Sequence, residues 1–208
     1  MITVWGGQTS RSIRVVWVLE EMGIPYRVRQ VDMLSPVEDT AWLAVNPGNF
    51  LPAIQDGDVT MVESIAIMEY LMGRYGPTPL QPTPHDPTFP AYQQFLHMGE
   101  AGLATLMMPV VVSRFMAPEA ERENWGANWS LKAFQKRLKM VSERLAHSPY
   151  LAGEAFTAAD ISVTFALNLA RRNCGVTLGD AEEAYLARTT GRDAYKRAFE
   201  RSHEGVEA

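Results

Sequence analysis

Hydrophobic positions in the first third of the chain follow a strand-like pattern and a helix-like pattern in turn. The apolar run at residues 2–5, broken by two glycines, predicts a short buried strand. Apolar residues then recur every three or four positions from 15 to 22, which predicts a helix ending at Gly23 and Pro25. Polar and apolar residues alternate over 26–33 and predict a second strand.

A strand–strand–helix group follows. Residues 51–57 and 59–62 predict two short strands that meet at Asp56-Gly57-Asp58. A helix is expected from about Ser64, because four apolar side chains share one face: Ile65, Met68, Met72 and Tyr75. The two groups together predict a small α/β sandwich.

Proline then interrupts the pattern. Residues 76–90 hold six prolines among fifteen positions. Proline lacks a backbone donor and disfavours the α conformation of the residue before it, so neither a helix nor a central strand is expected. We predict a proline-rich linker over 77–90 between a domain at 1–76 and a second at 91–208. The alternative is a long surface loop within one domain.

No strand pattern appears after this linker. Residues 91–116 are helical in composition, with a kink expected at Pro109, and 193–201 predict a last helix. Residues 157–160 begin another helix with a capping-box-like sequence. One clean apolar stripe consists of Leu131, Phe134, Leu138, Val141 and Leu145. The second domain is therefore predicted to be an all-α bundle.

Composition excludes several classes of protein. The net charge of −5 argues against a nucleic-acid partner, which requires clustered basic residues. No uninterrupted apolar run reaches the roughly 18 residues of a membrane span, and no signal-peptide pattern is seen, so a cytoplasmic protein without a membrane partner is expected. The single cysteine, Cys174, excludes an internal disulfide. No metal site is expected from the four scattered histidines: His85, His97, His147 and His203.

Three hydroxyl residues, Thr9, Ser10 and Ser12, lie where the first strand gives way to a helix. Such residues are usually helix N-caps. The same position favours an anion, because free N–H groups and the helix dipole point there, and a hydroxyl can donate a hydrogen bond to a thiolate. Both interpretations remain open on the pattern alone.

Two further pairs stand out. Leu51-Pro52 begins a short strand, where a cis peptide bond is an uncommon option. Glu63-Ser64 begins the next helix, as a solvated charge and an N-cap, or as the receptor for the ammonium and carboxylate of an amino acid.

Three motifs carry a resemblance to a known family. The segments NPGNFLPAI at 46–54, VESIAIMEYL at 62–71 and FTAADI at 156–161 resemble those of the cytosolic glutathione S-transferases in order and separation. The resemblance implies a thioredoxin-like first domain, an all-α second domain and commonly a homodimer. It also implies that FTAADI is a structural capping box.

For the first domain, the resemblance implies that Pro52 is cis and that the Leu51 backbone binds the cysteinyl part of glutathione. Glu63 and Ser64 would hold its γ-glutamyl group. Phe50 stands where the family often has Lys or Gln near the glycyl carboxylate. Phenylalanine cannot neutralise a carboxylate, so we expect weaker binding or a substitute base such as Arg11.

The catalytic hydroxyl is expected at the first helix. The segment TSRSIRVVWVLEEMGIPY looks like theta- and zeta-like members that use a serine at the first helix. We choose Ser10, with Thr9 second and Ser12 third. The first domain has no cysteine, and no tyrosine lies near its first strand, so the cysteine-type and tyrosine-type members do not fit.

An apolar second substrate is expected against the first helix of the bundle. Candidate wall residues are His97, Met98, Leu103, Met107, Met108, Arg114 and Phe115, most of which could equally pack the bundle. Cys174 is interpreted as an inert buried thiol.

The resemblance implies a glutathione S-transferase that activates the thiolate of its co-substrate, glutathione, for attack on a small apolar electrophile. One alternative is a glutathione-dependent isomerase, dehalogenase or ether-cleaving enzyme. Another is a non-catalytic protein that binds glutathione or apolar ligands. A structural interaction module would require a lost glutathione site, against which Pro52 and Glu63-Ser64 argue.

Overall fold

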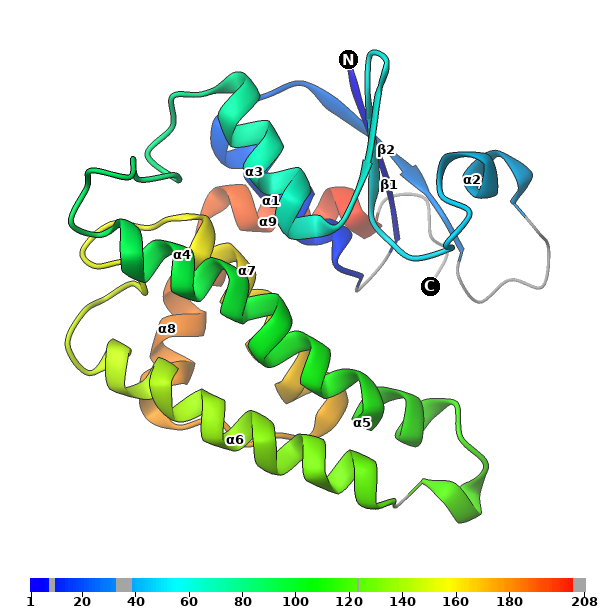
Figure 1. The fold of residues 1–208 in the computed structure, drawn as a ribbon, viewed down its shortest axis with the longest axis vertical. Helices are drawn as coiled ribbons and strands as arrows, with labels where there is room; N and C mark the ends of the chain where they lie inside the picture. The colour runs from blue at the N-terminus through cyan, green and yellow to red at the C-terminus, as the bar shows by residue number, and fades with distance from the viewer. Residues whose placement is uncertain (8–9, 33–38, 123, 204–208) are drawn as a thin grey trace. The chain divides into compact units, whose positions relative to one another are not determined.

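A computed structural model describes residues 1–7, 10–32, 39–122 and 124–203. The chain divides into two compact units, Met1–Thr78 with the segment from Gly191 onward, and Pro79–Thr190 (Figure 1). The first unit contains β1 (Ile2–Gly6), α1 (Ser12–Met22), β2 (Tyr26–Gln30), α2 (Thr40–Val45), β3 (Ala53–Asp56), β4 (Val59–Val62), α3 (Ser64–Tyr75) and α9 (Asp193–His203).

The first unit is built on a four-stranded sheet in the order β2-β1-β3-β4. β1 and β2 are parallel, whereas β3 is antiparallel to both of its neighbours. The predicted hairpin at Asp56-Gly57-Asp58 is confirmed, and Gly57 has a positive φ of 58° there, which glycine adopts without strain. The second strand ends at Gln30, short of the predicted Met33.

Side chains alternate between the two faces of this sheet. One face is covered by α2, whose Trp42 stacks on Trp5 with ring centroids 6.0 Å apart. Helix α2 was not foreseen in the sequence, because it is six residues long and buries only Trp42. The other face is covered by α1 and α3, which contact each other and the sheet (Figure 1).

Helix α1 is buried on more sides than its predicted stripe. Val16 and Trp17, outside that stripe, are also buried, because α9 packs along α1. The ring of Tyr195 meets Trp17 edge-on at 4.8 Å, and Arg192 donates two hydrogen bonds to the Glu21 carboxylate at 2.6 and 2.8 Å. The predicted last helix thus exists, but it packs in the first unit rather than with the helical half, where the sequence had placed it.

The second unit is helical. It comprises α4 (Phe89–His97), a π-helical segment η1 (Met98–Ala104), α5 (Thr105–Phe115), a short 3₁₀ turn η2 (Glu119–Glu121), α6 (Trp125–Leu145), α7 (Ala158–Cys174) and α8 (Asp180–Thr190). In the described residues, the run Phe89–Phe115 is the one helix long and apolar enough to cross a membrane by length and composition, and half of its most apolar window is buried inside the protein, as in a core helix.

The π-helical segment lies against α7. The Ser162 hydroxyl donates to the Leu96 carbonyl at 2.8 Å, and a Cβ at Gly99 would lie 2.2 Å from the Ser162 oxygen. A side chain at position 99 would therefore force the two helices apart. This wide turn precedes Pro109, which lies inside α5.

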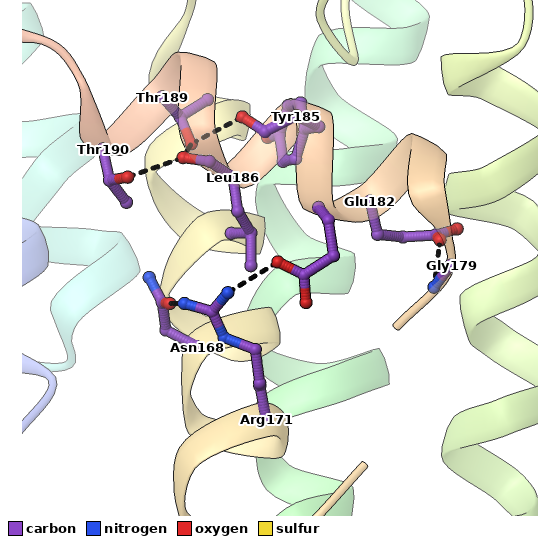
Figure 2. Close-up of polar contacts among 9 residues, drawn as sticks. Asn168, Arg171, Gly179, Glu182, Tyr185, Leu186, Thr189 and Thr190 are labelled. Atoms are coloured by element: carbon purple, nitrogen blue, oxygen red, sulfur yellow. Dashed lines mark hydrogen bonds and ion pairs between the residues drawn. The ribbon is translucent and has the colours of Figure 1, made fainter. Parts of the chain in front are cut away.

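Helix α8 is held to its neighbours by polar contacts. Arg171 on α7 forms an ion pair of 2.6 Å with Glu183 and also donates to Asn168 at 3.1 Å (Figure 2). Glu182 accepts the Gly179 N–H at 2.9 Å at the start of α8 and a hydrogen bond from the Ser142 hydroxyl on α6. These polar contacts stabilise the packing of α8 in the bundle, although its apolar stripe is weak.

Candidate functional site

The loop between β1 and α1 holds the first part of the candidate site. The Ser10 hydroxyl lies 2.9 Å from the Gly7 carbonyl and 2.7 Å from the Ser12 hydroxyl, and it accepts the Ser12 N–H at 3.3 Å. The Ser12 hydroxyl also lies 3.1 Å from the Gly7 carbonyl and accepts the Gly7 N–H at 3.3 Å. Both hydroxyls therefore lie within hydrogen-bond distance of the Gly7 carbonyl.

The hydroxyls of Ser10 and Ser12 differ in solvent exposure. Ser12 is buried, whereas Ser10 is partly exposed. Because either proton can satisfy the Gly7 carbonyl, Ser12 can hold it while Ser10 turns its own proton outward. Of these two hydroxyls Ser10 is the more accessible, and its role toward a ligand stays a prediction. Thr9, the second candidate, lies outside the described residues.

The two glycines before these serines have no room for a side chain. A Cβ at Gly6 would lie 2.6 Å from the Ser12 Cβ. A Cβ at Gly7 would lie 2.8 Å from the Val31 carbonyl oxygen and 3.3 Å from the Leu51 Cδ1. Gly7, three residues before Ser10, therefore lies close to the Leu51 side chain.

Leu51 enters β3 through a cis peptide bond to Pro52, so the prediction of a cis proline is confirmed. Pro52 is buried and Leu51 is partly exposed. Among the described residues, none forms a hydrogen bond with the backbone of Leu51. Its N–H and C=O are the groups that an extended peptide backbone would pair with, as expected from the sequence.

The start of α3 forms the third part of the site. Ser64 is 3% exposed, and its hydroxyl accepts a hydrogen bond of 3.2 Å from Nη1 of Arg14, a fully buried residue of α1. Since Arg14 is the donor in this contact, the Ser64 hydroxyl proton remains free to be donated onward. The cationic guanidinium and the positive end of the α3 dipole both favour a carboxylate here.

Glu63 precedes this helix with φ 70° and ψ 104°, a conformation that residues other than glycine rarely adopt. Its side chain is exposed and forms no ion pair with a described residue. A carboxylate and a helix N-terminus side by side can receive the ammonium and carboxylate of one amino acid.

Phe50 and Arg11 complete the predicted set in the first unit. The Phe50 ring is 79% exposed, and its carbonyl accepts from the Asn46 side-chain amide at 2.7 Å. Arg11 is partly exposed at the residue before α1. The role of each toward a ligand stays a prediction.

The predicted second-substrate residues fall into two groups within the helical unit. Met98, Leu103 and Met107 are buried in the bundle, and Met108 is partly buried. His97, Arg114 and Phe115 are exposed. Packing in the bundle accounts for the burial of Met98, Leu103 and Met107, and the role of the seven residues toward a second substrate stays a prediction.

Arg114 has a structural partner that the sequence did not indicate. A Cβ at Gly175 would lie 3.0 Å from Nη1 of Arg114, which places the guanidinium at the C-terminal end of α7. A cation is favourable at that end of a helix dipole. Burial raises the pKa of the Cys174 thiol beside it, although Arg114 opposes that shift, so the thiol is poorly suited to act as a nucleophile.

Arg14 was missed as a site residue. The available signal was a charged residue four positions before Val18, on the face of α1 predicted to be apolar. Periodicity alone does not say which group a buried charge contacts. Within the described residues, no group of three His, Cys, Asp or Glu side chains is placed to hold a metal ion.

A cavity of about 510 Å³ lies at the opposite end of α1, lined mainly by Glu20, Pro25, Arg27, Gln30 and Arg201. Burial would raise the pKa of Glu20, but hydrogen bonds from Tyr26 and Arg197 outweigh burial and lower it. The Glu20 carboxylate in this cavity already accepts hydrogen bonds from two donors. The cavity lies away from Ser10 and Ser12, at the C-terminal end of α1.

Fold and site together define a class, namely proteins with a thioredoxin-like domain and an added all-α domain. The N-terminal domain model of the glutathione S-transferases matches residues 1–73, and their C-terminal domain model matches 103–185. Glutathione S-transferase 3 of Schizosaccharomyces pombe is 30% identical over 185 residues, which cover 83% of this chain and 76% of that relative. The chain therefore belongs to the glutathione S-transferase family.

Two further relatives show the range of the similarity. A theta class glutathione S-transferase from Xanthomonas axonopodis pv. citri, solved with glutathione bound, matches with a TM-score of 0.78 and 27% identity over 95% of this chain and 96% of that one. A stringent starvation protein A homolog of Pasteurella multocida is 27% identical over 191 residues, covering 88% of this chain and 82% of the relative.

Proposed function

We propose that this protein binds glutathione in its first unit and activates the thiol for attack on a small apolar electrophile. The observation that carries this proposal is the presence of three groups in the first unit: the partly exposed Ser10 hydroxyl, the Leu51 backbone, which forms no hydrogen bond with a described residue, and the Arg14–Ser64 contact. A theta class relative of similar fold, solved with glutathione bound, supports the choice of ligand.

Each group has a distinct task in this proposal. The Leu51 backbone pairs with the cysteinyl residue, Ser64 and the N-terminus of α3 bind the γ-glutamyl carboxylate, and Glu63 binds its ammonium. Ser10 donates to the thiolate while Ser12 holds the Gly7 carbonyl. Stabilising the thiolate by about 1.4 kcal/mol lowers its pKa by about one unit.

The reaction then follows from the chemistry of the thiolate. Its sulfur donates an electron pair to an electrophilic carbon, a carbon–sulfur bond forms, and a leaving group departs with its bonding pair. The protein contributes the ionised thiol and its position. The apolar electrophile, a homodimer and a cytoplasmic location stay predictions.

The test is a pH titration of bound glutathione, read by the ultraviolet absorbance of its thiolate, in the wild type and in Ser10→Ala. We expect a thiol pKa well below that of free glutathione in the wild type and a return toward the free value in Ser10→Ala. S-methylglutathione, which has no ionisable thiol, should bind both proteins equally. Wild-type binding without a pKa shift would refute thiol activation.

A non-catalytic glutathione-binding protein is the second candidate. It is favoured by the hydrogen bonds that Ser10 makes within its own loop and by the apolar side chain at Phe50. The same titration separates the two candidates, since a carrier binds glutathione and leaves its thiol protonated. An isomerase or dehalogenase shares the thiolate and is separated by product analysis.

A further inference from the structure

The Phe50 ring is exposed on a backbone that is held in place. The Asn46 side chain donates to the Phe50 carbonyl at 2.7 Å and accepts the Gly48 N–H at 3.0 Å. The Asn49 side chain accepts from the Trp42 indole at 2.7 Å. The Phe50 ring is 79% exposed, so it does not contribute to the hydrophobic core.

The position of Phe50 relative to a bound thiol follows from strand direction, given the proposed function. Ala53 pairs with Val62, after which the chain turns into the N-terminus of α3. A γ-glutamyl group held at Ser64 therefore lies on the Pro52 side of the cysteinyl residue at Leu51. An extended ligand that pairs antiparallel with Leu51 then places its next residue beside Phe50.

The sequence around Phe50 offers no cation to the glycyl residue of the ligand, which follows its cysteinyl residue. Positions 30–73 contain no Lys, Arg or His but seven Asp or Glu residues. Of the nearby cations in the first unit, Arg14 contacts Ser64 and Arg29 forms an ion pair with Asp39 at 2.5 Å. Arg11, the substitute base expected from the sequence, lies directly before α1 and is the alternative partner for a carboxylate.

We propose that Phe50 sets the specificity for the C-terminal end of the thiol substrate, so that thiols with a neutral or apolar group there are accepted at least as well as glutathione. A phenyl ring makes apolar contacts and cannot donate a hydrogen bond to a carboxylate. Taking a carboxylate out of water without a cation or donor is unfavourable, whereas an ester or an alkyl group gains from the same contact.

The test compares glutathione with its glycyl monoethyl ester, by dissociation constant and by kcat/KM with one fixed chloronitrobenzene electrophile. In the wild type we expect the ester to match glutathione within about threefold or to exceed it. Phe50→Lys should raise kcat/KM for glutathione about five- to tenfold without a gain for the ester. Val59→Lys adds the same charge on the exposed β4 strand. This control should leave kcat/KM unchanged for both glutathione and its ester.

A tenfold or greater preference of the wild type for free glutathione would overturn the proposal, and loss of that preference in Arg11→Gln would assign the carboxylate to Arg11. In that outcome the proposed function stands, because glutathione still binds and ionises. If neither thiol binds, both the specificity assignment and the proposed function fail.

Discussion

Asp160 at the start of α7 is the buried charge from which a stability prediction follows most directly. Its carboxylate is fully buried and accepts the N–H of Leu151 and the N–H of Thr157, each at 2.9 Å, one on each oxygen. The Tyr185 hydroxyl donates a third bond at 3.0 Å. In Asp160→Asn, the amide nitrogen replaces one acceptor, so one backbone N–H is left unsatisfied at a cost of about 1 to 3 kcal/mol.

The size of this loss depends on pH in a predictable direction. Burial raises the pKa of Asp160 from 3.8 to about 6, even though the hydrogen bonds from Leu151, Thr157 and Tyr185 act to lower it. Because the folded-state pKa is the higher one, the contribution of Asp160 to stability is fully present below about pH 4 and is lost as pH rises through 6. From about pH 5 to pH 8 the wild type should lose about 1.4 kcal/mol that the asparagine variant does not.

The assay is urea unfolding, followed by circular dichroism at about pH 5, 6.5 and 8. Asp160→Asn should be less stable than the wild type at pH 5, and the gap should narrow toward pH 8. Glu154→Gln, an exposed substitution nearby, is the control for removing a carboxylate at the surface and should unfold close to the wild type. A gap for Asp160→Asn that widens with pH would mean that the hydrogen bonds outweigh burial, and the reasoning would be wrong.

Three further substitutions test the site and the packing. Ser12→Ala removes the acceptor of the buried Gly7 N–H and should lower the free energy of unfolding by about 1 to 3 kcal/mol in urea titrations, while the glutathione dissociation constant changes less than in Ser64→Ala. Ser64→Ala should weaken glutathione binding by about 1 to 3 kcal/mol in calorimetric titration, and an unchanged dissociation constant would remove Ser64 from the γ-glutamyl site. Gly99→Ala should destabilise the helical unit by about 1 to 3 kcal/mol in thermal unfolding, and an unchanged melting temperature would show that Ser162 can move aside.

Elements with a strong periodic pattern were predictable, and elements stabilised by contacts distant in sequence were not. The β3–β4 hairpin follows from two short apolar runs with a glycine between them. Helix α2 has one buried side chain and therefore no stripe. The placement of α9 depends on contacts between Glu21 and Arg192, 171 positions apart, which no local pattern contains.

The candidate site divides in the same way. Leu51-Pro52 and Glu63-Ser64 were found because turn and helix-start residues carry local sequence signals. Ser10 and Ser12 differ in solvent exposure, and this difference depends on how α1 packs rather than on local sequence. The contact of Arg14 with Ser64 joins residues fifty positions apart, and only the packing of α1 against α3 brings them together.

That contact has a consequence for how the site works as a unit. Arg14 lies on the first turns of α1, directly after the serine loop, and its guanidinium reaches the first residue of α3. Because α1 is enclosed by β1, α3 and α9, its first turn cannot shift without disturbing the Ser64 contact. Arg14 therefore links the first turn of α1, which follows Ser10, to the start of α3 at Ser64. Since thiol activation depends on small displacements between donor and sulfur, the proposed function requires this rigidity in α1 as much as it requires Ser10.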